Sequence, residues 1–151
     1  MLRISKLADY ATLIMSYLAL HSNQIFSAVA IAKQIHLAVP TVSKILKILA
    51  EAKLVISQRG AAGGYKIARS AEDITVAELV SAIEGYPSLT ECCSSSACAL
   101  DSLCAIKDNW KMINKVMMSA LASLTLQDML QPLVRHPLTL RGISIKVQHE
   151  Q

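Results

Sequence analysis

Residues 27–52 have the sequence SAVAIAKQIHLAVPTVSKILKILAEA, which predicts two short helices joined by a tight turn. We expect the first helix over 27–36, with Ser27 as its N-cap, because a serine oxygen can accept a hydrogen bond from the first turn. Residues 37–39 connect it to a second helix that opens at Pro40, where the missing N–H is no loss. Apolar residues at helical spacing predict the buried face of this helix: Val42, Ile45, Leu46 and Leu49. Such a pair is typical of a helix-turn-helix.

The segment that follows predicts a β-hairpin. Residues 54–58 (LVISQ) and 65–68 (YKIA) are strand-like, and the glycine-rich turn RGAAGG lies between them. A hairpin placed directly after such a helix pair is a wing. Its glycines allow positive φ and a close approach to phosphate, and Arg59 at the tip is placed to enter a minor groove. The alternative is an ordinary hairpin with a solvated arginine.

Further helices flank this core. A first helix is predicted over 3–21, and a capping box of Thr75 and Glu78 starts another that ends at Gly85. C-terminal to these, apolar residues step by three and four, a heptad pattern that favours pairing with a second copy of the same helix. The predicted seam is Leu103, Ile106, Trp110, Ile113, Met117, Ala120 and Leu124. Packing within one chain is the alternative.

Composition and charge restrict the class of protein. Apolar residues make up 53% of the 151 residues but aromatic residues only 4%, which favours an aliphatic, helical core. No apolar run is long enough for a membrane span, and Asp9 interrupts the N-terminal stretch that resembles a signal peptide, so we expect a cytoplasmic protein. Residues 1–70 carry nine basic and two acidic side chains, against six and nine in the remainder. This asymmetry predicts that the N-terminal half meets a polyanion.

All four cysteines lie between residues 92 and 104, in the pattern Cys92-x5-Cys98-x5-Cys104 with Cys93 beside the first. Zinc knuckles use shorter gaps, and the wider spacing fits a cluster with several metal corners better. Three sulfurs leave one ligand to find. Candidates for it are Cys93, Glu91, Asp101 and, from a distant segment, Asp9. Zinc and a thiol redox switch stay open as alternatives.

Together these segments resemble the iron–sulfur-dependent winged-helix regulators related to IscR and NsrR, with the closest likeness to regulators of the SUF cluster-assembly system. The resemblance covers residues 2 to about 130. It is carried by LRISKLADYAT, PTVSKILKIL, RGAAGGYKIAR, ITVAELVSAIEG, the three-cysteine loop after Thr90-Glu91, NWKMINKVMMSAL and SLTLQDML.

The resemblance implies that Cys92, Cys98 and Cys104 bind an iron–sulfur cluster, either 2Fe-2S or 4Fe-4S. IscR-like members have a histidine ligand where this chain has Lys107, which cannot serve while protonated. NsrR-like members have an aspartate in the first helix, and Asp9 matches it; there the fourth ligand can come from the partner subunit. Asp9 is therefore the first choice for that ligand and Glu91 the second.

The expected architecture is mostly α with a small β-hairpin wing. A winged helix-turn-helix domain (1–84) precedes the cysteine loop (85–104) and a dimerisation helix with its closing turn (105–131). For the tail (132–151) the sequence predicts no regular structure, and the tail can be disordered.

The expected function is a homodimeric repressor of cluster-assembly genes, which senses cluster status through its bound iron–sulfur cluster and binds a roughly palindromic site on double-stranded DNA. Pro40, Thr41, Ser43 and Lys44 would meet the major groove, and Arg59 the minor groove. Phosphates would be held by Arg3, Lys6, Lys47, Gly60, Gly63 and Gly64. A nitric oxide or redox sensor of the same family and an iron–sulfur carrier are the competing readings. Neither a membrane nor a small-molecule substrate is expected as a partner. Enzymatic activity is not expected either, since the four histidines are scattered and no nucleophile–base pair is present.

Overall fold

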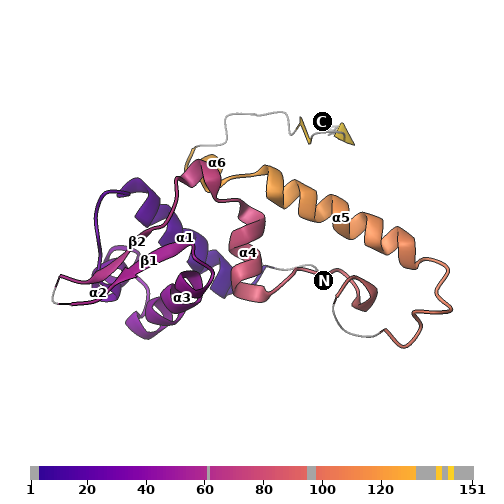
Figure 1. The fold of residues 1–151 in the computed structure, drawn as a ribbon, viewed down its shortest axis with the longest axis horizontal. Helices are drawn as coiled ribbons and strands as arrows, with labels where there is room; N and C mark the ends of the chain where they lie inside the picture. The colour runs from indigo at the N-terminus through magenta and orange to yellow at the C-terminus, as the bar shows by residue number, and fades with distance from the viewer. Residues whose placement is uncertain (1–3, 61, 95–97, 132–138, 141–142, 145–151) are drawn as a thin grey trace, which may run out of the picture.

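The fold is that of a computed structural model that describes residues 4–60, 62–94, 98–131, 139–140 and 143–144. The protein is mostly helical with one β-hairpin wing, as predicted (Figure 1). Its helices are α1 (Lys6–Leu20), α2 (Ala28–Gln34), α3 (Val39–Glu51), α4 (Val76–Glu84), α5 (Lys107–Ser123) and α6 (Leu126–Leu130). The wing consists of β1 (Val55–Gln58) and β2 (Gly64–Ile67), and two 3-10 turns are η1 (Ala71–Asp73) and η2 (Glu91–Cys93).

Serine N-caps set the starts of the first two helices, whereas α3 has no side-chain cap. The Ser5 side chain accepts a hydrogen bond from the N–H of Ala8, so α1 begins at Lys6 rather than at residue 3. Ser27 accepts from the N–H of Ala30 at 3.1 Å, which confirms it as the N-cap of α2. Helix α3 begins at Val39, one residue earlier than predicted, with Pro40 in its first turn.

The core lies between α1, α3, α4 and the inner side of the hairpin. The predicted buried face of α3 is confirmed, because Val42, Ile45, Leu46 and Leu49 are all 0% exposed. Fully buried aliphatic side chains from α1 and α2 meet them: Ile14, Met15, Leu18 and Ile31. This close-packed core fixes the position of α3 relative to the wing.

The wing is an antiparallel pair in which Val55 lies opposite Ile67 and Gln58 opposite Gly64. Strand β2 is also joined to the segment before α2, since the backbones of Phe26 and Tyr65 exchange hydrogen bonds of 3.0 and 2.8 Å. The hairpin tip projects from the side of the winged domain opposite α5 (Figure 1).

Helices α4 and α6 are tied together at their starts. The predicted capping box of Thr75 and Glu78 is confirmed, and Gly85 ends α4 with a φ of 78°. Thr125 and Asp128 form a second capping box on α6. Two backbone hydrogen bonds join the starts of the two helices, from Val76 to Leu124 and from Leu126 to Ile74.

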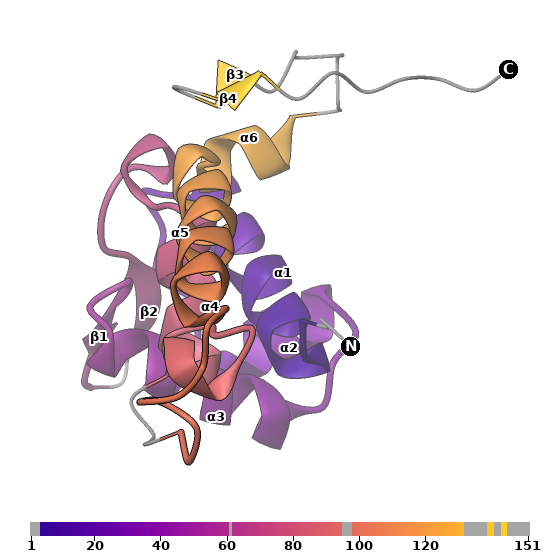
Figure 2. The ribbon, with the colours of Figure 1, turned by 90° about the vertical axis from the view of Figure 1, so that its right-hand side faces the viewer.

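Helix α5 runs beside α4, and the cysteine loop leads into its N-terminal end (Figures 1 and 2). The prediction of a continuous heptad helix from Leu103 is wrong at both ends. Leu103 and Ile106 precede α5, because the N–H groups of Leu103 and Lys107 bond to Leu100 and Cys104 in two successive turns. Leu124 follows α5 in extended backbone.

Part of the tail has structure where none was predicted. The two-residue strands β3 (Thr139–Leu140) and β4 (Ile143–Ser144) form an antiparallel pair. The rest of 132–151 lies outside the described residues. None of the helices in the described part of the chain combines the length and apolarity that a membrane crossing requires.

Candidate nucleic-acid interface and cysteine loop

Helix α3 presents the basic face that the sequence predicts. Pro40, Lys44 and Lys47 are exposed, whereas Thr41 and Ser43 are half-buried and so present less side chain than expected. The reason is geometric, since Thr41 and Ser43 flank the fully buried Val42 on the helix surface. The face is therefore dominated by its two lysines.

The wing adds Arg59, which is exposed beside Gly60 at the hairpin turn. Gly60 has a φ of 113°, which confirms the predicted positive φ at this position. Within the described ranges the two ion pairs are Arg69–Glu78 and Lys107–Asp101, so Lys44, Lys47 and Arg59 have no carboxylate within 4.0 Å there. Their charges are available to an external anion.

The structure gives Gly63 and Gly64 a different role from the one predicted. Neither has positive φ in the described chain. A Cβ on Gly63 would lie 2.4 Å from the carbonyl oxygen of Gln58, and one on Gly64 would lie 2.4 Å from that of Phe26. Both glycines are thus required by backbone packing inside the hairpin, and a phosphate contact at either remains a prediction.

Of the other predicted phosphate contacts, Lys6 is exposed on the first turn of α1, and Arg3 lies outside the described residues. The start of α1 is anchored to the end of α4, because the Ser5 N–H donates a 2.8 Å hydrogen bond to Glu84 Oε1. The exposed Asp9 is on the same end of α1, and Gly85 begins the cysteine loop directly after Glu84. This end of α1 therefore lies at the base of the loop.

The four cysteines are half-buried and free, and two of them share one neighbour. The Thr90 hydroxyl lies 3.1 Å from Cys92 Sγ and donates a 3.4 Å hydrogen bond to Cys93 Sγ. Residues 95–97, next to Cys98, lie outside the described residues.

The cysteine loop fits an iron–sulfur cluster in its chemistry but is not assembled around one. Free thiols spaced along one loop are the donors such a cluster requires. In the described part of the chain, however, no three Cys, His, Asp or Glu side chains are close enough together to hold a metal ion. Within the described residues of this single chain, Cys92, Cys98 and Cys104 therefore do not form such a group with Asp9 or Glu91.

The C-terminal half of the loop is closed by an ion pair. Lys107 Nζ donates a 2.5 Å hydrogen bond to Asp101 Oδ2. This hydrogen bond, together with the positive charges of Lys107 and Lys111, lowers the pKa of Asp101 below its usual value. Asp101 is thus already partnered, which disfavours it as the missing ligand.

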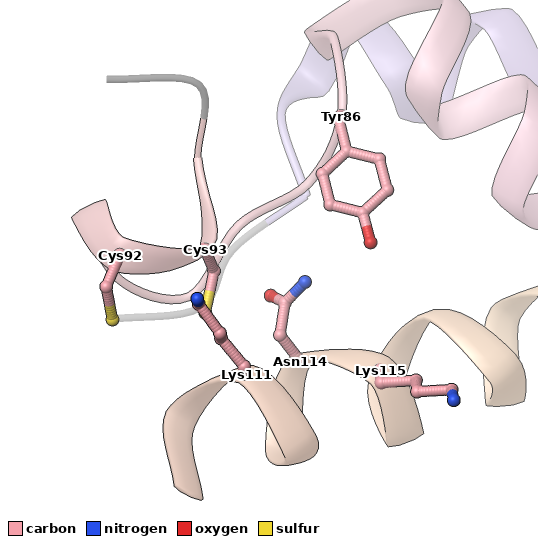
Figure 3. A pocket seen from close by; sticks show the side chains of 6 residues that line it. All are labelled: Tyr86, Cys92, Cys93, Lys111, Asn114 and Lys115. Atoms are coloured by element: carbon pink, nitrogen blue, oxygen red, sulfur yellow. The ribbon is translucent and has the colours of Figure 1, made fainter. Parts of the chain in front are cut away.

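The N-terminal half of the loop is fastened to α5 by Asn114, which is only 3% exposed. Its Oδ1 accepts a 3.0 Å hydrogen bond from the N–H of Leu89, and its Nδ2 donates a 3.4 Å hydrogen bond to the carbonyl of Pro87. Asn114 also lines a pocket of about 220 Å³ with Tyr86, Cys92, Cys93, Lys111 and Lys115 (Figure 3). Helix α5 therefore forms one wall of the cysteine site.

Sequence reasoning missed this wall. Lys107, Lys111 and Lys115 recur every four residues, a spacing that places them on one helix face and was a usable signal. No sequence pattern could identify the role of Asn114, because its partners lie 25 and 27 residues away in a loop of irregular backbone.

The predicted seam of α5 is partly exposed. Ile113 is 48% exposed, and Trp110, Met117 and Ala120 are half-buried. Asn114 is the one buried residue of this 17-residue helix. Leu103 and Ile106, although outside the helix, are 84% and 55% exposed next to its start.

Comparisons with known proteins agree with this arrangement. The model of the Rrf2 family, described as an iron-dependent transcriptional regulator, matches residues 4–132. The chain is 29% identical to protein rrf2 of Nitratidesulfovibrio vulgaris over 150 residues, covering 98% of this chain and all of that one. Among solved structures, CymR, the global cysteine regulator of B. subtilis, is 30% identical with a TM-score of 0.67, covering 86% of this chain and 97% of CymR. IscR of T. potens is 31% identical with a TM-score of 0.64, covering 85% and 86%.

Proposed function

Because the chain belongs to the Rrf2 family of transcriptional regulators, we propose that it is a homodimeric repressor of iron–sulfur cluster assembly genes. It senses cluster supply through an iron–sulfur cluster on the cysteine loop. The observation that carries the proposal is the attachment of a four-cysteine loop, through Asn114, to the helix that bears the partly exposed apolar seam. The family description as iron-dependent supports the same sensing chemistry.

In this proposal α3 enters the major groove of double-stranded DNA. Lys44 faces the base edges, with Pro40, Thr41 and Ser43 at the N-terminal end of the same face, and Lys47 and Lys6 hold phosphates. Arg59 enters the neighbouring minor groove, where the charge of two strands attracts a guanidinium. Two-fold symmetry then requires a roughly palindromic site, with half-sites about 34 Å or a multiple of it apart.

The cluster would be held by Cys92, Cys98 and Cys104, with Asp9 as the fourth ligand and Glu91 or Cys93 as the alternatives. When bound, the cluster would join the three cysteines of the loop to one another and to the fourth ligand through iron–ligand bonds. Anchoring of α1 to α4 through Ser5 and Glu84 supports Asp9, because that contact keeps the first turns of α1 at the base of the loop. Glu91 is exposed in η2, directly beside Cys92.

The dimer would form along α5 and its flanks. Ile113 on α5 and Leu103 and Ile106 just before it are exposed apolar side chains that a partner would cover, and a second copy supplies the same surface by symmetry. Leu124, which directly follows α5, accepts a hydrogen bond from Val76 at the start of α4. A shift of α5 against its partner would therefore be passed to α4 and to the α3 helix packed against it. Loop closure around a cluster would act on DNA affinity by this route.

The experiment is an anaerobic purification, followed by iron and sulfide assays and a visible spectrum on the same sample. DNA binding is then compared for protein with and without the cluster. We expect sulfide to match iron and the two forms to differ in affinity. A colourless protein that holds zinc, or no metal after anaerobic reconstitution, would contradict the cluster while leaving DNA binding intact.

A second candidate is a regulator that senses nitric oxide or thiol oxidation through the same loop. The free, half-buried cysteines and the likeness to CymR support it. A cluster that is destroyed by one or a few equivalents of nitric oxide, together with loss of DNA binding, would favour nitric oxide. Family membership leaves no support for the carrier alternative, since its members are regulators.

A further inference from the structure

A row of three lysines runs along α5. Lys107, Lys111 and Lys115 are four residues apart, so their side chains share one face of the helix. Like charges at this spacing repel one another and destabilise an isolated helix. An anion lying against the row would relieve this repulsion.

The cysteine loop lies against this row. Lys111 and Lys115 line the 220 Å³ pocket whose other walls include Cys92, Cys93 and Tyr86. In Figure 3 the side chain of Lys111 points from α5 toward the two cysteines, whereas that of Lys115 points away from them.

The three lysines also differ in their partners. Lys107 is neutralised by Asp101. Lys111 has no carboxylate within 4.0 Å and no side-chain hydrogen bond among the residues that the structure describes. A cationic group without a carboxylate partner that points at sulfur ligands can donate hydrogen bonds to those sulfurs and so stabilise a metal site.

We propose that Lys111 is the positioning residue that stabilises an iron–sulfur cluster on this loop, through its positive charge and hydrogen bonds to the thiolate sulfurs at Cys92 or Cys93. The inference rests on the proposed function, because it requires that a cluster binds there. Thiolate ligands make such a cluster anionic, and charge and hydrogen bonds at its sulfurs set its stability and reduction potential.

The placement of Lys111 connects the cluster to the dimer helix. Trp110 and Ile113, on either side of it in sequence, belong to the predicted seam, and Asn114 fastens the same turn of α5 to the loop. Attraction between the cluster and Lys111 would therefore act on the turn of α5 that faces the partner.

The test compares Lys111→Met with Lys115→Met in full-length protein reconstituted without oxygen. Both variants remove one positive charge from the same helix face, one turn apart. We expect Lys111→Met to lose iron to EDTA about tenfold faster than wild type and to have a more negative midpoint potential. Lys115→Met should behave as wild type, and Lys111→Arg should restore most of the stability. Circular dichroism and thermal unfolding establish that each variant is folded.

Each contrary outcome has its own meaning. Equal iron loss and potential in wild type and Lys111→Met would overturn the role of Lys111 while the cluster stands. Equal effects of the two methionine variants would overturn it too, because the whole row would then act as a diffuse field. Wild type without iron and sulfide would overturn the proposed function and this inference together. Weaker DNA binding by cluster-free Lys111→Met, with unchanged iron loss, would assign the row to phosphates instead.

Discussion

The side-chain oxygen of Asn114 accepts a 3.0 Å hydrogen bond from the backbone N–H of Leu89, and this contact joins the cysteine loop to α5. Asn114 is 3% exposed and is the one buried polar residue among those described. A buried amide that bonds to irregular backbone specifies one position of the loop, because any other leaves polar groups without partners. The segment 87–89 at the start of the loop is consequently held against α5.

Replacing Asn114 by alanine should destabilise the fold by about 1–3 kcal/mol, because the N–H of Leu89 and the carbonyl of Pro87 lose their partner. Urea unfolding followed by circular dichroism measures the change. Asn109→Ala is the matched control, since Asn109 is exposed on the same helix and should change stability by less than about 0.5 kcal/mol. Equal effects of the two substitutions would show that the hydrogen bonds from Asn114 to Leu89 and Pro87 do not contribute to stability.

Features that rest on local hydrogen bonds could be predicted from the sequence. Ser27, the Thr75–Glu78 capping box and the Gly85 terminus each involve residues within four positions of one another, and each lies where expected. The buried face of α3 follows from the helical period in the same way. The family resemblance was carried by the same segments.

Features that rest on distant contacts could not be predicted. The start of α5 at Lys107 depends on the backbone turns of the cysteine loop, which the heptad pattern does not register. Gly63 and Gly64 satisfy a turn signal, but their packing against Gln58 and Phe26 depends on how the hairpin meets the rest of the domain. The hydrogen bonds of Asn114 to Leu89 and Pro87 could not be predicted for the same reason.

Gly64→Ala should weaken the wing. A Cβ at this position would lie 2.4 Å from the Phe26 carbonyl oxygen and would force the Phe26–Tyr65 bridge apart. Overpacking of this kind costs about 1–3 kcal/mol. Thermal unfolding should show the loss, whereas Ser57→Ala, an exposed position of β1, should change stability little. A fully stable Gly64→Ala protein would mean that the backbone at Phe26 can shift to make room for the added Cβ.

The capping carboxylate of α4 predicts a loss of stability in acid. Burial raises the pKa of Glu78, but hydrogen bonds from Thr75 and Arg69 outweigh it and leave the pKa lowered from 4.5. A lowered pKa stabilises the fold above the unfolded value, and this stability disappears as the pH falls through the folded value. Glu78→Gln keeps a capping amide without the charge. Its melting temperature should lie below that of wild type at pH 7 and approach it at about pH 3, and a constant difference would rule out this linkage.

Lys47→Ala should weaken DNA binding uniformly across sequences, because Lys47 is an exposed cation of α3 that is predicted to hold phosphate. Loss of one phosphate contact should reduce the slope of log affinity against log salt by about 1. Fluorescence anisotropy at several salt concentrations measures both quantities. Lys115→Ala removes the same charge from α5 and should leave the slope unchanged. An unchanged slope for Lys47→Ala would place α3 away from the backbone.

Ile113→Glu should convert the dimer to monomer. Ile113 is 48% exposed in the single chain and lies at the centre of the predicted seam, so a second copy would bury it, and a carboxylate there would be buried without a partner. Met112→Glu is the control, because Met112 is 66% exposed on the same helix but lies off the seam. Sedimentation velocity should report a dimer for wild type and Met112→Glu, and a monomer for Ile113→Glu. If Ile113→Glu remains dimeric while Met112→Glu dissociates, the partner covers the neighbouring face of α5 and the seam has to be redrawn around Met112.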